Sequence, residues 1–351
     1  MSRPAAWLLS AYHTDSHAYW ADWLEANQPG LEWHRFSLPG RHFRWRIRGN
    51  PLSWLDRLPQ QTPAIIVATS MVDLATLRGL MPRLGRTPSL YYFHENQFAY
   101  PRSAQQHPSI DPQMVQLYGA LAADRLAFNS AYNRDSFLRG VEELARRLPD
   151  HVPRRLPSRL ADKSRILPVP IAPVPPRPGQ KDPQLILWNH RWEYDKAPQV
   201  FSEAIDILLQ HNCRFRLALL GGRGKPAHPA LQHLREVAAQ RIVADGRLAL
   251  DEYQALLQQA GIVVSSAIHE FEGIAMLEAV SGGARPLVPD DLCYVEQYPT
   301  AYRYPAGDAA TLADTLRRWL DGDLPPPVDV AAWSSEQLRP AWSSNLMELL
   351  S

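Results

Sequence analysis

The chain has 351 residues, 45% hydrophobic and 21% charged, with a net charge of +1, which is the composition of a soluble globular protein with room for two domains. No apolar run reaches membrane-spanning length and the N-terminus lacks the features of a signal peptide. Cys213 and Cys293 are too few for a disulfide framework or a cysteine metal site. We therefore expect a cytoplasmic protein with no membrane association.

The charge is unevenly distributed along the chain. Residues 1–175 hold 21 Lys and Arg against 14 Asp and Glu, a net +7, and the remainder is therefore −6. This asymmetry favours contact of the first half with an anionic partner, although two domains with mutually attracting faces would show the same pattern.

Strand and helix patterns alternate in both halves of the chain. In the first half, apolar runs predict strands over residues 5–11, 64–69, 89–93, 125–129 and 166–170, and capping residues predict helices over 16–27, 112–123 and 131–148 and one from Ser70 or Asp73 to about residue 84. A proline-rich segment, residues 173–183, predicts a semi-rigid linker. Beyond it, strands are predicted over 184–188, 215–220 and 262–264, and helices over 197–211 and 274–280.

These elements predict an α/β fold. It has two doubly wound Rossmann-like domains, residues 1–172 and 184–327, and an amphipathic helical tail, residues 328–351, that packs back on the body.

Two polar clusters follow predicted strands of the first domain. The first strand ends in a loop that contains Tyr12, His13, Asp15 and His17, which an N-cap and a surface turn explain only in part. A later strand ends at His94, Glu95, Asn96 and Gln97. Because ligands bind at the carboxyl ends of parallel strands, we interpret both clusters as parts of a site; for His94 alone, a structural histidine satisfied by backbone is the alternative.

Two segments of the first half are rich in arginine. Between residues 38 and 49, alternation predicts an extended segment with guanidinium groups on one face and aromatic rings for base stacking, and its candidate ligand-binding residues are Arg41, Arg44, Trp45 and Arg46. A second concentration of arginine lies between residues 146 and 165. Both favour an anion or RNA, and solvated basic loops are the alternative in each case.

The stretch Val263 to Pro289 contains a buried strand, a loop and the start of a helix. Gly273 allows close backbone approach, Ile274 begins the predicted helix, and the positive end of such a helix suits a phosphate. Glu270 and Glu278 flank this point and are placed to bind hydroxyl groups, although two solvated glutamates would have the same spacing.

The loop after the first strand of the second domain carries two cations, Arg191 and Lys196. It leaves the sheet at the edge from which the helix at Ile274 starts. Two cations and a helix N-terminus together predict a site for a diphosphate.

The chain resembles the retaining glycosyltransferases of the two-domain GT-B architecture in its motifs. These enzymes carry a Glu-x7-Glu motif, here Glu270 and Glu278, and an Arg and Lys pair, here Arg191 and Lys196. More closely, the chain is similar to the tRNA-queuosine mannosyltransferase family in the segments LPGRHFRWRIRGNP, FHENQFAYP, ALAADRLAFNSAYNRDSFL, ILWNHRWEYDK and HEFEGIAMLEAV. The resemblance extends over residues 38 to 280, nearly the whole chain.

The resemblance implies two domains that face a central cleft. It also implies transfer of mannose from GDP-mannose to the cyclopentenediol of queuosine in a tRNA anticodon, with retention and with tRNA-Asp as the acceptor. In that picture Glu278 holds the ribose, Glu270 the donor sugar, and Arg191 and Lys196 the leaving diphosphate, while His94 lies by the donor sugar and acceptor.

No cofactor and no essential metal are expected. Asp321, Gly322 and Asp323 match the Asp-x-Asp metal motif of another glycosyltransferase architecture, but they lie in a predicted C-terminal turn. Two other functions remain open from the residues alone, namely a GT-B glycosyltransferase with a lipid or polysaccharide acceptor and a non-catalytic RNA-binding module.

Overall fold

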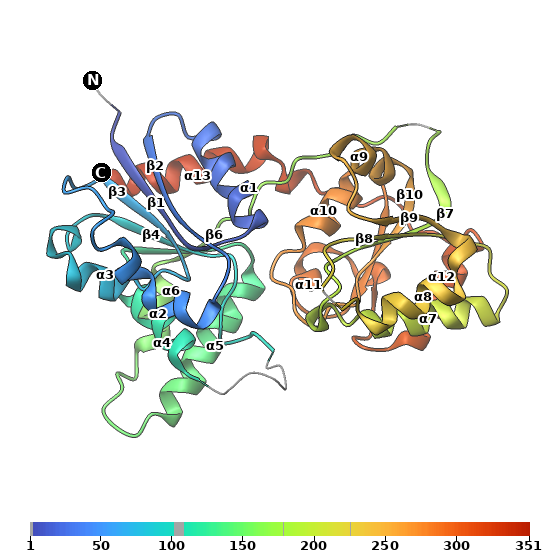
Figure 1. Cartoon of the computed structure of the whole chain (residues 1–351), viewed down its shortest axis with the longest axis horizontal. Coiled ribbons are helices and arrows are strands. Elements are labelled where there is room, and N and C mark those ends of the chain that lie inside the picture. The colour runs from blue at the N-terminus through green and yellow to red at the C-terminus, as the bar shows by residue number, and fades with distance from the viewer. Residues whose placement is uncertain (1–2, 102–108, 178, 225) are drawn as a thin grey trace. The chain divides into compact units, whose positions relative to one another are not determined.

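The computed structural model describes residues 3–101, 109–177, 179–224 and 226–351. The chain forms two compact units (Figure 1). Unit 1 contains Met1–Pro170 together with Glu336–Ser351, and unit 2 contains Ile171–Ser335. The residues 173–177 and 179–183 of the predicted linker therefore belong to unit 2, while Pro178 lies outside the described residues. Within the described residues, no helix is long and apolar enough to span a bilayer.

Unit 1 is built on a six-stranded parallel sheet of order β2-β1-β3-β4-β5-β6. Its strands are β1 (Ala5–His13), β2 (Glu32–Pro39), β3 (Ile65–Thr69), β4 (Ser89–Phe93), β5 (Arg125–Phe128) and β6 (Ser164–Ile166). The strand order reverses between β1 and β3, and in open α/β sheets ligands bind at the carboxyl ends beside such a point. The loop after β1, with Tyr12 and His13 at its start, therefore lies at the edge where a ligand is expected.

The helices of unit 1 cover both faces of its sheet. They are α1 (Asp15–Asn27), α2 (Phe43–Trp54), α3 (Leu74–Leu80), α4 (Asp111–Ala122), α5 (Ala131–Arg147), α6 (Leu156–Asp162) and the C-terminal α13 (Ser335–Leu350). Figure 1 shows α1 and α13 on one face and α2 to α5 on the other.

The segment 38–49 was predicted to be extended, which holds for Leu38 and Pro39 at the end of β2 but is wrong from Phe43 onward. Residues Phe43–Trp54 form helix α2. Its inward residues Phe43, Ile47, Asn50 and Trp54 are spaced as one face of a helix, a period that the alternating arginines obscure. The arginines are consequently distributed around a helix and not along one face of a strand. The preceding strand β2 was also missed, because its exposed polar residues interrupt any apolar run.

Unit 2 repeats the doubly wound architecture with the order β12-β11-β10-β7-β8-β9, all parallel. The strands are β7 (Asp182–Asn189), β8 (Arg216–Leu220), β9 (Ile242–Gly246), β10 (Ala260–Val264), β11 (Arg285–Pro289) and β12 (Arg303–Tyr304). The helices are α7 (Pro198–Gln210), α8 (Pro229–Val237), α9 (Leu250–Gln259), α10 (Ile274–Ser281), α11 (Tyr294–Gln297) and α12 (Ala309–Leu320). The predicted α/β class with two Rossmann-like sheets is thereby confirmed.

The order of strands in unit 2 locates its ligand edge. The first strand, β7, pairs directly with the fourth, β10, so the order reverses between them. Helices α7, α8 and α12 lie on one face of this sheet, and α9 and α10 lie on the other (Figure 1). The loops that leave the carboxyl ends of β7 and β10 lead to helices on opposite faces, and small ligands bind beside such a point in this kind of sheet.

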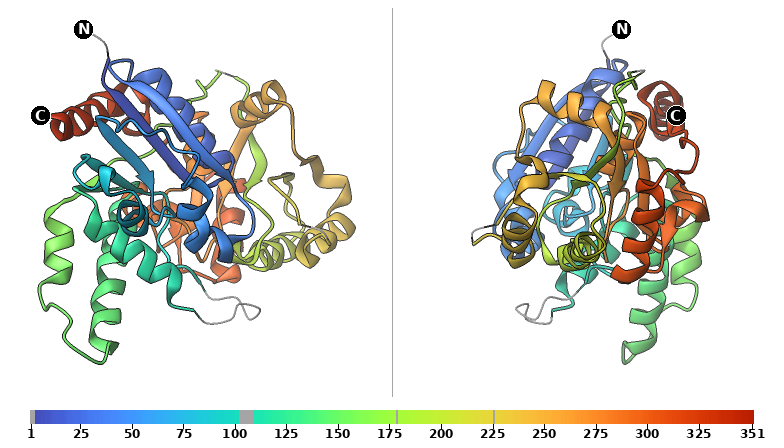
Figure 2. Two further views of the ribbon diagram at one scale, coloured as in Figure 1. Left: turned by 60° about the vertical axis from the view of Figure 1, so that its left-hand side comes forward. Right: turned by 90° about the vertical axis from the view of Figure 1, so that its right-hand side faces the viewer.

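The C-terminal helix α13 completes an aromatic cluster in unit 1. Trp342 is fully buried, its ring lies 5.1 Å from that of Tyr92 and 6.0 Å from that of Trp20, and its indole N–H donates to the carbonyl of Pro168 at 3.0 Å. Trp20 in turn stacks on Tyr92 with ring centroids 4.6 Å apart. Figure 2 shows α13 beside the sheet of unit 1 in two further views.

Trp342→Ala is expected to lower the free energy of unfolding of unit 1 by about 3–5 kcal/mol, because it opens a cavity among buried rings and removes a buried hydrogen bond. Chemical denaturation followed by near-UV circular dichroism measures this loss. Met347→Ala is the control, because Met347 lies on the same helix and its side chain is 56% exposed. Equal losses in the two variants would contradict a role for α13 in the core.

Candidate active site

Two loops meet at the ligand edge of unit 2. The loop after β7 holds Arg191 and Lys196, and the loop after β10 holds Glu270 and Gly273. They are fastened together by Ser266, whose hydroxyl lies 2.9 Å from the carbonyl oxygens of Lys196 and Ala197. The backbone N–H of Ile268 also donates to the carbonyl of Asp195 at 3.0 Å. The predicted convergence of these two loops is therefore present in the structure.

Lys196 is the centre of the charged residues at this edge. Its side chain is 8% exposed, and its ammonium donates to Glu270 Oε2 at 3.0 Å and to the carbonyl of His269 at 2.7 Å. Asp195 Oδ2 lies 3.3 Å from the same nitrogen. One buried cation is thus shared between two carboxylates and a backbone carbonyl.

These charges shift each other's protonation equilibria. Burial alone would lower the pKa of Lys196, but the carboxylates of Glu270 and Asp195 outweigh it and raise that pKa. Burial alone would raise the pKa of Glu270, but the attraction of Lys196 outweighs it and lowers the pKa to about 2. Lys196 and Glu270 are consequently both charged at neutral pH.

Two buried histidines adjoin the ion pair and were not among the predicted site residues. Burial, followed by the charge of Lys196, lowers the pKa of His190 and of His269 to about 4, so both rings are neutral. His190 Nε2 is buried and has no hydrogen-bond partner among the described residues. The signal in the sequence was their position, since His190 precedes Arg191 and His269 precedes Glu270.

Helix α10 points its N-terminus at this group of charges. Its N-cap is Gly273 at φ 69°, a left-handed conformation that glycine adopts without strain, and no side chain caps the helix. A Cβ at this position would lie 3.1 Å from the ring of Tyr294 and 3.6 Å from Glu270 Cγ. Met276 and Leu277 donate their N–H groups to the carbonyl of Gly273, so the N–H groups that can favour an anion at the side of Glu270 are those of Ile274 and Ala275.

Glu278 lies one turn further along α10 with a partner of its own. Tyr253 on α9 donates its hydroxyl to Glu278 Oε2 at 2.9 Å and accepts from Asn189 Nδ2 at 2.8 Å. Burial raises the pKa of Glu278, an effect that the Tyr253 hydrogen bond opposes. Tyr253 and Asn189 were not predicted, because neither stands in a motif around the glutamate.

Arg191 lies at the rim of this group. Its side chain is 58% exposed and forms an ion pair of 3.2 Å with Glu193. The loop around it packs against Gly221, at φ 97°, where a Cβ would overlap the carbonyl oxygen of His190. Arg191 is thus anchored at its backbone while its guanidinium group reaches solvent.

In unit 1, His94 lies within a cluster of rings at the carboxyl end of β4. Its ring centroid is 4.2 Å from that of His17, 4.7 Å from that of Trp20 and 4.6 Å from that of Tyr92. Burial, reinforced by the neighbouring His17, holds the pKa of His94 well below its ordinary value. His94 Nε2 is buried without a hydrogen-bond partner among the described residues, so the ring is a neutral group and not a cation.

The loop after β1 supplies the other predicted residues near His94. Thr14 Oγ1 and His17 Nδ1 lie 2.8 Å apart, and burial, with a smaller contribution from His13, lowers the pKa of His17 to about 4. His13 Nδ1 lies 3.0 Å from the hydroxyl of Ser10, and the half-buried Tyr12 packs its ring against Phe43. Asp15 is the exposed first residue of α1.

The residues after His94 serve the loop itself. Asn96 is fully buried, donates its amide to Asn133 and Ser136, and accepts from the backbone of Phe98 and Ala99, so it holds the loop in place and does not reach solvent. Glu95 and Gln97 are half-buried, and their side chains lie 3.3 Å apart. The prediction of a polar cluster at this edge fits Glu95 and Gln97, whereas Asn96 is a structural residue.

Helix α2 presents the arginines around its N-terminus. Arg41, Arg44 and Trp45 are exposed, with 53% of the Trp45 side chain accessible, and Arg46 is half-buried. The preceding strand β2 ends beside β1, since the N–H of Gly40 donates to the carbonyl of His13 at 3.1 Å. Arg41 precedes the helix, while Arg44, Trp45 and Arg46 lie on its first turn, which the contact of Phe43 with Tyr12 places next to the loop after β1.

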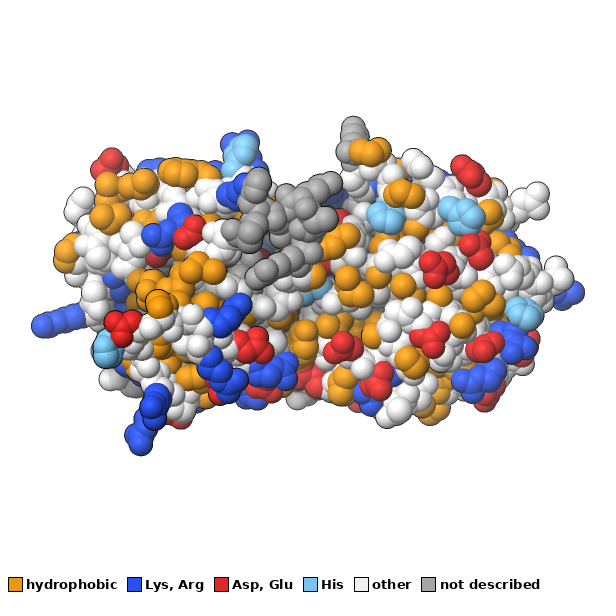
Figure 3. All heavy atoms as spheres, turned by 90° about the horizontal axis from the view of Figure 1, so that it is seen from below, with side chains coloured by type: hydrophobic (Ala, Val, Ile, Leu, Met, Phe, Trp, Pro, Cys, Tyr) orange, Lys and Arg blue, Asp and Glu red, His pale blue; other side chains and the backbone are white. Residues whose placement is uncertain are grey.

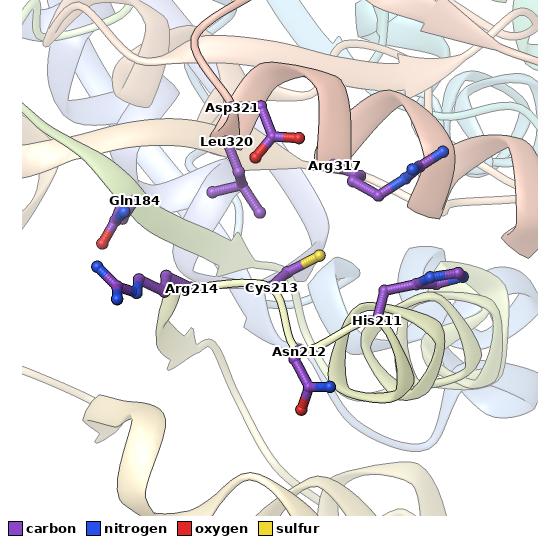
Figure 4. Close-up of a pocket in the computed structure, with 8 residues that line it drawn as sticks. All are labelled: Gln184, His211, Asn212, Cys213, Arg214, Arg317, Leu320 and Asp321. Atoms are coloured by element: carbon purple, nitrogen blue, oxygen red, sulfur yellow. The ribbon is translucent and has the colours of Figure 1, made fainter.

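A pocket of 410 Å³ in unit 2 lies away from these residues. It is lined by side chains that include Gln184, Cys213 and Asp321, near the start of β7, before β8 and after α12 (Figure 4). These positions are at the amino ends of the strands, opposite to Lys196. No group of three or more His, Cys, Asp or Glu side chains able to hold a metal ion occurs in the described parts of the chain.

Comparison with known proteins identifies the class of this chain. The family model of glycosyl transferases group 1 matches residues 183–322. Solved structures with a similar fold include sucrose-phosphate synthase from Thermosynechococcus elongatus, with a TM-score of 0.70, 13% identity and coverage of 100% of this chain and 95% of that one. Another is Anabaena HepE in complex with UDP and glucose, with a TM-score of 0.68, 11% identity and 99% coverage of both chains. The protein is a glycosyltransferase with the GT-B fold.

A closer relationship comes from sequence. The family model of the tRNA-queuosine alpha-mannosyltransferase N-terminal region matches residues 5–171. The tRNA-queuosine alpha-mannosyltransferase of Drosophila melanogaster is 32% identical over 289 residues, which cover 79% of this chain and 77% of that protein. The chain belongs to the tRNA-queuosine alpha-mannosyltransferase family, as its sequence motifs predicted.

The ion pair of Lys196 and Glu270 generates a stability prediction. Lys196→Met and Glu270→Gln should each lower the free energy of unfolding, by about 3–5 kcal/mol for the first, because it strands two buried carboxylates. The double variant should lose less than the sum of the two, with a coupling energy of about 1–3 kcal/mol. Denaturant unfolding of all four proteins measures this cycle, and additive losses would show that the two charges do not stabilise each other.

A second prediction concerns pH. The pKa of His17 is lowered to about 4 in the folded chain, so between that value and its ordinary pKa only the unfolded chain binds the proton. Stability therefore falls as the pH drops from about 6.5 toward 4. Between pH 7 and pH 5, the free energy of unfolding of His17→Gln should fall by about 2 kcal/mol less than that of the wild type. Urea denaturation at the two pH values measures this difference. The exposed His34→Gln is the control, and an unchanged pH dependence in His17→Gln would contradict the neutral, buried state.

Proposed function

We propose that the protein transfers mannose from GDP-mannose to the cyclopentenediol of queuosine in the anticodon of tRNA-Asp, with retention of configuration at the anomeric carbon. The bond from the anomeric carbon to the β-phosphate oxygen breaks, and a bond to a queuosine hydroxyl oxygen forms. The hydroxyl proton passes to the leaving diphosphate. Family membership supports the acceptor, and the charges of unit 2 support the donor.

The arrangement around Lys196 is the observation that carries the proposal. A buried ammonium, an uncapped helix N-terminus at Gly273 and the rim guanidinium of Arg191 together suit a diphosphate whose charge grows as it leaves. Glu270 is then placed to accept from hydroxyl groups of the sugar, and Glu278 from those of the ribose. The helix start at Gly273 and Ile274 supplies backbone donors to the phosphates.

In unit 1 we assign the acceptor to the loops at the carboxyl edge. His94 is neutral, so we assign it a hydrogen-bonding role toward sugar or acceptor and not a role as a countercharge. The remaining proposed acceptor residues are Tyr12, His13, Asp15, His17, Arg41, Arg44, Trp45, Arg46, Glu95 and Gln97, with Asn96 holding the loop.

Incorporation of radiolabel into tRNA tests the reaction. The enzyme is incubated with GDP-mannose, UDP-glucose or UDP-galactose and with matched tRNA that contains or lacks queuosine. We expect label only with GDP-mannose and queuosine-containing tRNA. Label in neither tRNA with any donor would overturn the proposal and leave a lipid or polysaccharide acceptor as the better assignment.

Two substitutions separate the proposed roles in unit 2. Lys196→Met should lower kcat on the order of 100- to 1,000-fold with tRNA affinity unchanged, because it removes stabilisation of the leaving group. Glu278→Gln should instead raise the KM for GDP-mannose on the order of 10-fold with a smaller change in kcat, because it weakens a charge-assisted hydrogen bond. Steady-state kinetics and a tRNA binding assay give both quantities, and a proportional loss of tRNA affinity in Lys196→Met would contradict its assignment.

A further inference from the structure

The turn between α5 and α6 carries arginines that neither the fold nor the proposed site uses. Helix α5 begins at the carboxyl edge of the unit 1 sheet, where Ser130 caps it, and runs for 17 residues, or about 25 Å. The chain then turns and returns through α6 to β6 (Figure 1). The turn therefore lies near the amino ends of the strands, far along unit 1 from His94.

Local structure accounts for some of the cations in this region. Residues 146–165 hold seven Lys or Arg and two Asp, a net +5. Arg146 forms an ion pair with Glu142 one turn earlier. The Lys163 ammonium donates to the carbonyls of Leu121 and Ala123, and Arg165 donates to the carbonyl of Ser164. These three side chains have structural partners.

Four others form what we call the arginine turn, which consists of Arg147, Arg154, Arg155 and Arg159. All four are exposed, and none forms an ion pair with a described residue. On α6, Leu156 and Leu160 are buried while Arg155 and Arg159, also four residues apart, are exposed. The arginine turn is thus an outward cationic surface on a helix whose inner face belongs to the core.

Two of the four arginines are placed unfavourably for the isolated fold. Arg154 and Arg155 stand at the N-terminus of α6, where the helix dipole disfavours a cation. Arg155 and Arg159 are like charges at a spacing of four residues, which destabilises a helix by about 0.2–0.5 kcal/mol. Arg147, in the last turn of α5, and Arg159, in the last turn of α6, are at positions that the dipole favours. The described residues supply no ion-pair partner for any of the four side chains.

We infer that the arginine turn binds the phosphate backbone of the acceptor tRNA, at a distance from the modified nucleotide. This inference rests on the proposed function, which supplies an RNA acceptor. Arginine is well matched to phosphate, and contacts to phosphate position an RNA without reading its sequence. Figure 3 shows one face of the molecule, on which Lys and Arg side chains project from the surface of unit 1.

A membrane surface fits the arginine turn less well than RNA does. Peripheral binding to lipid requires apolar side chains that enter the bilayer next to the basic ones. Within residues 131–165, all of which the structure describes, no large hydrophobic side chain is among those exposed. The surface therefore offers charge alone, which is sufficient for a nucleic-acid backbone.

Binding of an unmodified tRNA transcript tests the inference, because it does not depend on which nucleoside accepts the sugar. Filter binding between about 50 and 200 mM KCl compares wild type with Arg155→Gln/Arg159→Gln. We expect the double variant to bind on the order of 10-fold more weakly at the low-salt end and to show a salt slope smaller by about 2. The control is Arg177→Gln/Arg214→Gln, two exposed arginines of unit 2 without an ion pair to a described residue, and it should bind like wild type.

Kinetics with queuosine-containing tRNA separate this inference from the proposed function. The double variant should raise the KM for tRNA on the order of 10-fold with kcat within about twofold, since only phosphate contacts are lost. Sugar transfer with binding unchanged relative to the control would overturn the arginine turn assignment and leave the proposed function intact. If the double variant binds the transcript more weakly but the wild type transfers no sugar, the arginine turn assignment is supported and the proposed function is overturned. If the double variant loses binding to vesicles of phosphatidylserine and phosphatidylcholine while its tRNA binding stays intact, the surface is assigned to a membrane instead.

Discussion

The buried ammonium of Lys196 is the constraint on which the site in unit 2 depends. It lies where the strand order reverses, and it is held by Glu270, by Asp195 and by a backbone carbonyl. Breaking such a pair leaves a charge without a partner in a poorly solvated place, so the loops after β7 and β10 are bound to each other through their charges as well as through Ser266. The ion pair therefore helps to fix the geometry of this edge of the sheet.

This arrangement determines how the site receives an anion. The buried group holds two carboxylates and one ammonium, and its two histidines are neutral, so it has no surplus of positive charge. Under the proposed function, a diphosphate is then attracted by the uncapped N-terminus of α10 and by Arg191 at the rim, in addition to Lys196. Under the proposed function, Lys196 faces the leaving phosphates and Glu270 the sugar hydroxyls.

Much of the fold was predictable because its signals are local. Buried parallel strands are short apolar runs, and the polar residues that follow them mark the ligand edge, which is why the loops with His94, Lys196 and Glu270 were found. Helix α2 was not predicted, because arginine at every second position gives the alternation of a strand and hides the helical spacing of Phe43, Ile47 and Trp54. Strand β2 shows the same limit, since an edge strand with exposed polar residues lacks an apolar run.

The site was predicted only as far as its motifs reached. Glu278 stood out by its spacing, but its partner Tyr253 is 25 residues away on another helix, and nothing near Tyr253 marks it. Asn96 shows the converse error. It is a polar residue at the ligand edge and was predicted to bind a ligand, but its buried amide donates to Asn133 and holds the loop in place.

The two units differ in the kind of polar chemistry that they bury. Unit 2 buries charges, and their mutual attraction keeps Lys196 and Glu270 ionised. Unit 1 buries the rings of His17 and His94 in contact with each other and with Trp20, and burial keeps both uncharged. Two charged rings with centroids 4.2 Å apart would repel each other strongly in a poorly solvated place. Unit 1 can therefore offer hydrogen bonds at this edge without adding charge. Under the proposed function, the countercharges for the diphosphate come from unit 2. Those for the RNA backbone come from arginines at the surface of unit 1.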